Sequence, residues 1–158
     1  MPGMGTLPAS TPTPTPARQT SLPTCQCCGR AIKLRGKVIA LHGYQRPCWG
    51  VQTRSCYGAG YQPYAVARDG LVAMLVSLQR SVAALAQDVA AMRDTPVPVL
   101  VREGRTAMRP VWCQPTSALY PMRQREWFQR QATRMAGLVC EQAFAQQRYD
   151  AWKAPFPA

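Results

Sequence analysis

Five of the seven cysteines lie between residues 25 and 56, beside the only histidine of the chain, His42. The cluster opens with Cys25-Gln26-Cys27-Cys28-Gly29, where two thiols three residues apart can curl around one metal ion and the glycine permits a left-handed turn. An odd number of cysteines with no secretion signal argues against a disulfide framework. The sequence therefore predicts a structural zinc site that organises the N-terminal part of the fold.

Two ligand sets fit the spacing of this cluster. The favoured set joins three thiolates to one neutral imidazole in the pattern C-x2-C-x13-H-x13-C: Cys25, Cys28, His42 and Cys56. The alternative uses Cys48 in place of His42 and gives four thiolates. Cys27 lies inside the knuckle and is the least suitable ligand, while Cys113 and Cys140 lie outside the cluster and look like ordinary thiols.

The residue inventory argues against an enzyme. Four protein ligands would close the site and leave no position for a metal-bound water. The chain has one histidine, no acidic residue before Asp69 and no Gly-rich phosphate loop. Few residues are therefore available to form a catalytic site. Zinc is expected to serve folding.

Four segments around the cysteines resemble a group of small uncharacterised proteins of bacteria, phages and plasmids. They are Cys25-x-x-Cys28-Gly29-Arg30, Leu41-His42-Gly43-Tyr44-x-Arg46-Pro47, Gln52-Thr53-x-Ser55-Cys56-x-Gly58 and Pro63-Tyr64. The resemblance covers about 40 residues and a following helix. It implies a zinc-finger-like module held by Cys25, Cys28, His42 and Cys56, and a mobile-element context.

Composition divides the chain into three parts. Residues 1–24 hold six Pro and six Thr and should form a disordered, polyproline-like tail. Residues 25–66 form the zinc module, with a predicted β-hairpin of residues 31–34 and 37–41 around Arg35-Gly36. Residues 67–158 form a helical region with a short extended segment at 97–115. The fold class is α+β, mainly α: a zinc knuckle with a β-hairpin followed by two long helices.

The first helix should span Asp69 to Asp94, before Pro96. Its apolar positions follow a heptad seam: Leu71, Leu75, Leu78, Val82, Leu85, Val89 and Met92. The flanking positions carry no charges that would select a partner. The seam therefore fits either packing inside a helical bundle, including against the chain's own second helix, or a self-associating coiled coil.

The second helix should run from about Met122 to Lys153. We expect its apolar face to hold Phe128, Ala132, Met135, Val139 and Ala143, with an arginine stripe of Arg123, Arg130 and Arg134 on another face. Between the helices, residues 97–101 and 106–112 suit a short hairpin with Pro98 at an edge.

The charge is concentrated at the zinc end. The chain carries 19 cations and 7 anions, and no Asp or Glu precedes residue 69. Cations interleaved with aromatic residues indicate contact with nucleic acid, and we expect DNA rather than RNA as the partner. The candidate contacts are Arg30, Lys33, Arg35, Lys37, Arg46 and Arg54. In the alternative interpretation, Tyr44 and Trp49 build a small core, and Arg30 and Arg46 hydrogen-bond the loop backbone.

These features favour a non-enzymatic, zinc-stabilised nucleic-acid-binding accessory protein of a phage or plasmid, acting in the cytoplasm. The sequence has no stretch of about 18 consecutive apolar residues, so it predicts no membrane span. The alternative is an adaptor or inhibitor that binds a host complex through the helical region. In either case the heptad seam could join two copies of the chain.

Overall fold

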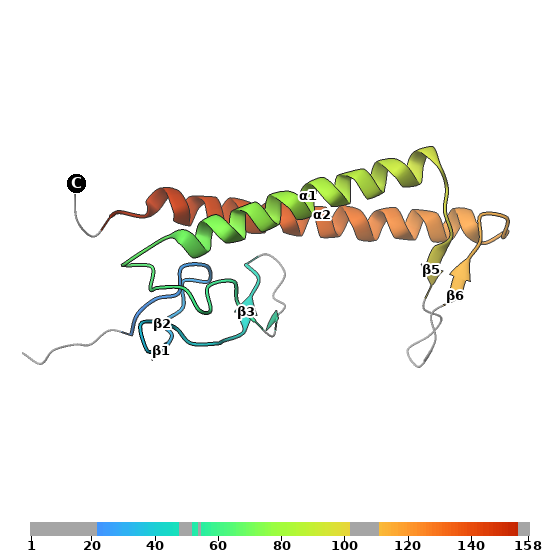
Figure 1. Ribbon diagram of the computed structural model, residues 1–158. Coiled ribbons are helices and arrows are strands. Elements are labelled where there is room, and N and C mark those ends of the chain that lie inside the picture. The colour runs from blue at the N-terminus through green and yellow to red at the C-terminus, as the bar shows by residue number, and fades with distance from the viewer. Residues whose placement is uncertain (1–21, 48–51, 54, 102–110, 155–158) are drawn as a thin grey trace, which may run out of the picture.

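The computed structural model describes residues 22–47, 52–53, 55–101 and 111–154. Two long helices, α1 (Asp69–Asp94) and α2 (Tyr120–Ala151), run antiparallel along each other, and the cysteine-rich module lies against the end where α1 begins and α2 finishes (Figure 1). The predicted fold class, a small β-hairpin module followed by two packed helices, is confirmed. Residues 1–21 of the predicted tail lie outside the described residues.

Helix α1 has the predicted bounds, and its seam packs within the chain. A continuous core joins the seam to α2 through the buried side chains Leu71, Met74, Leu75, Leu78, Leu85, Leu138 and Ala145. Val82 and Val89 are partly buried against the same core. Of the two alternatives for the seam, packing within the chain therefore explains its apolar positions.

Helix α1 is also long and apolar enough to cross a membrane by length and composition alone, with a mean hydropathy of 1.3 over its most apolar window. The core helix of a helical hairpin meets the same criterion, since one of its faces is buried against its neighbour. Here that face is the heptad seam.

The buried face of α2 differs from the predicted one. Leu138 and Ala145 are buried, whereas Val139 is 51% exposed and Ala132 and Ala143 are also exposed. The face that meets α1 follows the spacing Phe128, Gln131, Met135, Leu138, Gln142, Ala145 and Tyr149. Two of these positions are glutamines, which interrupt the helical period of apolar residues. A prediction from hydrophobicity alone therefore chose a different face.

A small hairpin joins the helices at the end remote from the cysteine-rich module (Figure 1). Strands β5 (Val99–Val101) and β6 (Val111–Cys113) are antiparallel, with Leu100 opposite Trp112. Val99 and Val101 are buried. The predicted strands include all of β5 and the first two residues of β6, which continues one residue further, to Cys113. Residues 102–110 lie outside the described residues.

The cysteine-rich module contains two very short sheets. Strands β1 (Leu34–Arg35) and β2 (Val38–Ile39) form the predicted hairpin, but its turn lies at Gly36-Lys37 rather than at Arg35-Gly36, because Arg35 pairs with Val38. Gly36 has a φ of 67°, as the first position of a type II′ turn requires. Strands β3 (Tyr44–Gln45) and β4 (Gln52–Thr53) form a second pair. With so little sheet, the module needs other contacts to hold its shape.

Candidate metal centre

Four side chains from three segments meet in the module. The ligand atoms of Cys25, Cys28, His42 and Cys56 all lie within 4.8 Å of one another. Cys28 Sγ lies 3.3 Å from His42 Nε2, and the sulfurs of Cys25 and Cys56 are 3.8 Å apart. The structure thus brings together the ligand set that the spacing favoured.

The knuckle places two of these thiols by its backbone. Gly29, with a φ of 72°, donates its N–H to Cys25 O at 3.1 Å, and Cys25 N–H bonds Arg30 O at 2.9 Å. The second half of the site is tied to the first by Cys56 N–H, which donates to His42 O at 2.9 Å. A Cβ on Gly58 would collide with Cys25 Sγ, so this position needs a glycine.

The imidazole is oriented by a carbonyl outside the cluster. His42 Nδ1 lies 2.8 Å from Ala40 O, and a carbonyl oxygen only accepts hydrogen bonds, so Nδ1 carries the proton. In the neutral ring this leaves the Nε2 lone pair directed at Cys28 and the centre of the cluster. His42 is therefore prepared as a metal ligand rather than as a proton shuttle.

The thiols share their protons unequally. Hydrogen bonding to Cys25 and then to Cys56 lowers the pKa of Cys28 far below its ordinary value. The bond to Cys28 raises the pKa of Cys25, and the bond to Cys25 raises that of Cys56. Without a cation, one thiolate on Cys28 would be held by S–H donors, and binding a metal would expel the remaining protons.

This donor set fits Zn²⁺. Three thiolates with one imidazole make a common structural zinc site. Tetrahedral zinc with Zn–S distances near 2.3 Å separates two sulfurs by about 3.8 Å, which is the separation found between Cys25 and Cys56. Four ligands from the chain close the coordination shell, so a bound zinc would hold the segments together.

The other cysteines do not join this group among the described residues. Cys27 is fully buried and its Sγ lies 3.4 Å from Gly70 O, so it packs against α1, as the sequence led us to expect of a non-ligand. Cys113 is a free thiol. Cys140 is a disulfide cysteine, which corrects its interpretation as an ordinary thiol. Cys48, the alternate ligand, lies outside the described residues.

Sequence reasoning missed the residues that attach the knuckle to the helices. Gln26 is fully buried: its Oε1 accepts the N–H of Gly70 at 2.7 Å, and its Nε2 donates to Asp69 Oδ1 at 2.9 Å. Arg148 of α2 donates from Nε to Gln26 O at 2.9 Å and from Nη2 to Cys25 O at 3.2 Å. Nothing in their local sequence marks these two residues.

Glu141 is a second missed contact. It is 1% exposed on α2, with Oε2 3.8 Å from Arg46 Nε. Burial, followed by the negative charge of Glu141, raises the pKa of Tyr44. A lone acid within the apolar stretch 136–145 was the available signal, because a carboxylate there must find a buried partner.

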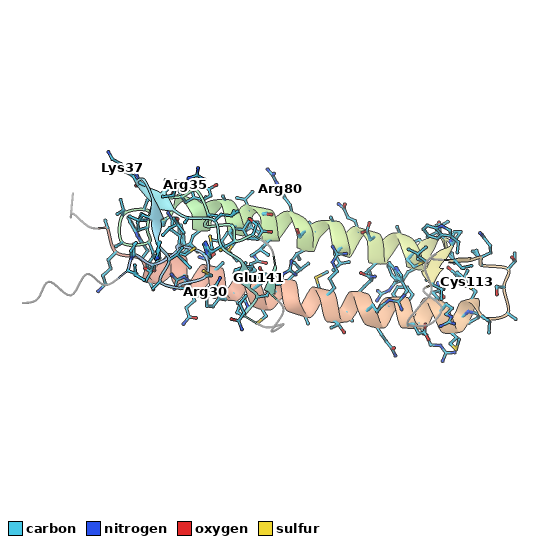
Figure 2. The ribbon with its side chains drawn as sticks, turned by 90° about the horizontal axis from the view of Figure 1, so that it is seen from below. Arg30, Arg35, Lys37, Arg80, Cys113 and Glu141 are labelled. Atoms are coloured by element: carbon cyan, nitrogen blue, oxygen red, sulfur yellow. The ribbon has the colours of Figure 1, made fainter. Side chains whose placement is uncertain are left out.

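The candidate nucleic-acid contacts separate into two groups. Arg30 donates from Nη2 to Gly43 O, and Arg46 pairs with Glu141, so both support the module from within. Lys33, Arg35 and Lys37 are exposed on and beside β1 and β2. Figure 2 shows Arg35 and Lys37 at the outer edge of the molecule, at the end of the cysteine-rich module and opposite to Cys113. Arg54 lies outside the described residues.

The aromatic residues of the module serve mainly as packing. Tyr44 is 1% exposed and meets Tyr57 edge to face, with ring centroids 6.2 Å apart. Tyr64 donates from its hydroxyl to Arg148 O at 2.6 Å. Tyr57 remains 40% exposed. The reading of Tyr44 as core is thereby confirmed, and Trp49 lies outside the described residues.

Comparison with known proteins gives no relative: no family model, no curated protein and no solved structure matches this chain. What the fold and the site define is a helical hairpin that carries a Cys3His cluster able to bind a metal ion.

Proposed function

We propose that the chain is a non-enzymatic, zinc-stabilised accessory protein that binds nucleic acid, duplex DNA in preference to RNA, through its β1–β2 hairpin. The observation that supports it best is the exposure of Lys33, Arg35 and Lys37 on one small hairpin, where none of the three forms an ion pair with another described residue. Exposed cations without acidic partners are available to phosphates, whose contacts dominate nucleic-acid affinity.

The metal centre has a structural part in this proposal. Zinc would fix the knuckle, and with it the hairpin that leads from Cys28 to His42, so that three flexible side chains act from one rigid base. One Zn²⁺ ion bound by three thiolates contributes a net charge of about −1. The module therefore stays basic. We place the protein in the cytoplasm of a host that carries a phage or plasmid, following the motif resemblance.

The test is duplex DNA binding by fluorescence anisotropy, from about 50 to 200 mM salt. The variant Lys33→Gln, Arg35→Gln, Lys37→Gln should flatten the slope of log affinity against log salt by about three, since each phosphate contact contributes about 0.9. Arg125→Gln, Arg130→Gln, Arg134→Gln is the matched control, because it removes three exposed charges from α2 instead.

Each outcome of this test has a meaning. No binding at the lowest salt, or an equal loss in both triple variants, would refute a hairpin interface. Unchanged metal content and circular dichroism in both variants would show that folding is not the cause, as expected for exposed side chains.

An adaptor or inhibitor acting on a host complex is the alternative. The seam residues expected to serve it are buried against α2, so such a partner, or a second copy of the chain, would have to use other faces of the helices. A partner that survives high salt and nuclease treatment in a pull-down would favour this alternative.

A further inference from the structure

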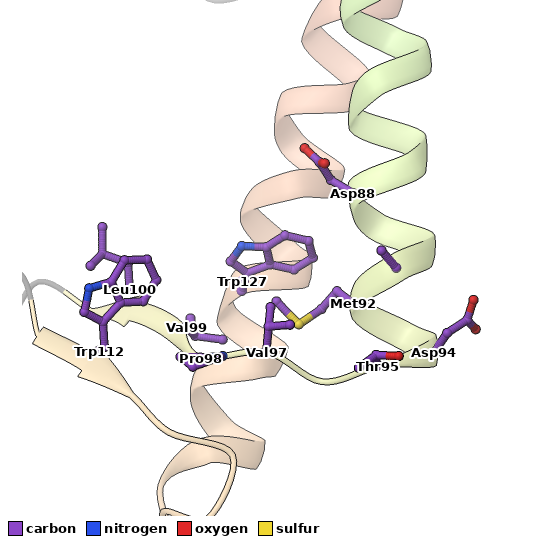
Figure 3. A pocket seen from close by; sticks show the side chains of 11 residues that line it. Asp88, Met92, Asp94, Thr95, Val97, Pro98, Val99, Leu100, Trp112 and Trp127 are labelled. Atoms are coloured by element: carbon purple, nitrogen blue, oxygen red, sulfur yellow. The ribbon is translucent and has the colours of Figure 1, made fainter.

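A pocket of about 620 Å³ lies at the end of the helical hairpin remote from the metal centre. It is bounded by the last turns of α1, the start of α2 and the β5–β6 hairpin (Figure 3). Met92 and Trp127 lie on its helical side, and Leu100 and Trp112 on its strand side. Its size falls within the range of about 300 to 1,000 Å³ typical of ligand pockets.

The strand side of the pocket is apolar and uncovered by the described residues. Val99 and Val101 point into the protein, so the alternation of the strand turns Leu100 and its cross-strand partner Trp112 outward. Trp112 is 58% exposed and Leu100 39%. An exposed tryptophan beside a pocket is the kind of residue that contributes most to binding energy when a partner covers it.

The charge of the pocket is opposite to that of the chain. Among the described residues, its lining holds two carboxylates, Asp88 and Asp94, and no Lys or Arg, although the chain carries 19 cations and 7 anions. Neither aspartate belongs to an ion pair of the described residues. Asp88 and Trp127 both line the pocket (Figure 3). A carboxylate and an aromatic ring that line the same pocket can both attract a cation, the first by ion pairing and the second by the ring quadrupole.

We propose that this pocket binds a basic, apolar segment of a partner polypeptide. An arginine or lysine of the partner would lie between Asp88 and Trp127, and a neighbouring apolar side chain would cover Trp112. The pocket volume exceeds what one side chain needs, which favours a short peptide segment over a single amine. This site takes a cationic ligand and is separate from the proposed phosphate-binding hairpin.

The experiment uses the full-length zinc-loaded protein and a dye-labelled peptide of alternating leucine and arginine, followed by anisotropy. A second peptide carries citrulline, a neutral isostere, at every arginine. Asp88→Asn should weaken binding of the arginine peptide by about fivefold, the effect of losing one partly exposed ion pair. The matched control is Asp150→Asn, the same charge change near the other end of α2.

Several results would overturn the proposal. Equal affinity for the citrulline peptide would mean an apolar groove without charge selection. Equal weakening by Asp88→Asn and Asp150→Asn would mean that only the net charge matters, and no binding at about 1 mM peptide would mean no site. Tryptophan fluorescence of the free protein that changes with its own concentration would assign the pocket to a second copy instead. DNA binding should be equal in Asp88→Asn and Asp150→Asn, so the two proposals fail independently.

Discussion

The side-chain oxygen of Gln26 accepts the backbone N–H of Gly70 at 2.7 Å, so a residue of the metal-binding knuckle caps helix α1 from outside the helix. Gln26 Oε1 also lies 3.3 Å from Leu71 N, and no side chain of the helix itself caps this end. The first-turn N–H groups of a helix need such acceptors. The metal centre and the helical hairpin are therefore one structural unit.

Replacing this cap should weaken the whole fold. Gln26→Ala removes the acceptor from Gly70 and Leu71 and the donor to Asp69, and we expect it to lower the free energy of unfolding by about 2 kcal/mol. Denaturant unfolding of the zinc-loaded protein measures this. Gln79→Ala, an exposed site on α1, is the control and should change stability by less than about 0.5 kcal/mol. Equal effects would argue against the cap.

The identity of the metal ligands is testable with Co²⁺. Cys28→Ser should abolish stoichiometric binding and the thiolate charge-transfer absorption, because the site loses its central thiolate. Cys27→Ser should bind one equivalent, since Cys27 packs against Gly70. His42→Cys keeps four ligands and replaces the imidazole with a fourth thiolate. This variant should therefore keep the stoichiometry and show a stronger charge-transfer band. Loss of binding in Cys27→Ser would contradict the assignment.

Metal affinity should rise with pH. The raised pKa values of Cys25 and Cys56 mean that the metal-free site holds protons that the metal-bound site has lost. Because the free form binds more protons, raising the pH favours metal binding, by at least about tenfold per pH unit for one proton released. Zinc competition titrations at pH 6 and pH 8, against a chelator of known pH dependence, measure it. A flat profile would contradict the proton distribution.

The buried carboxylate of α2 should matter far more than an exposed one. Glu141→Gln removes the negative charge of the pair with Arg46, and we expect a loss of about 2 kcal/mol, less than the loss of a fully buried pair costs because Arg46 is 32% exposed. Glu126→Gln breaks the partly exposed pair with Arg123, 3.1 Å apart, in which the carboxylate is 40% exposed, and should cost about 0.3 kcal/mol. Thermal unfolding compares them, and similar losses would refute a structural role for Glu141.

Local signals sufficed for the ligand set and for helix α1. The knuckle Cys25-x-x-Cys28 and the fixed spacing to His42 and Cys56 limit which side chains can share an ion, and the structure brings these four together. The heptad seam and Pro96 likewise placed α1 at Asp69–Asp94. Both predictions depend on residues close in sequence, whose geometry the backbone largely dictates.

The tertiary structure alone decided what each face meets. Gln26, Arg148 and Glu141 gained their roles from contacts up to 123 residues away in sequence, and those contacts turned Arg46 inward. They also selected the buried face of α2, whose glutamines interrupt the apolar period, and left Trp112 exposed beside Asp88 and Trp127. A polar side chain is buried only where a distant partner satisfies it, so its place follows from packing between segments rather than from its neighbours in the chain.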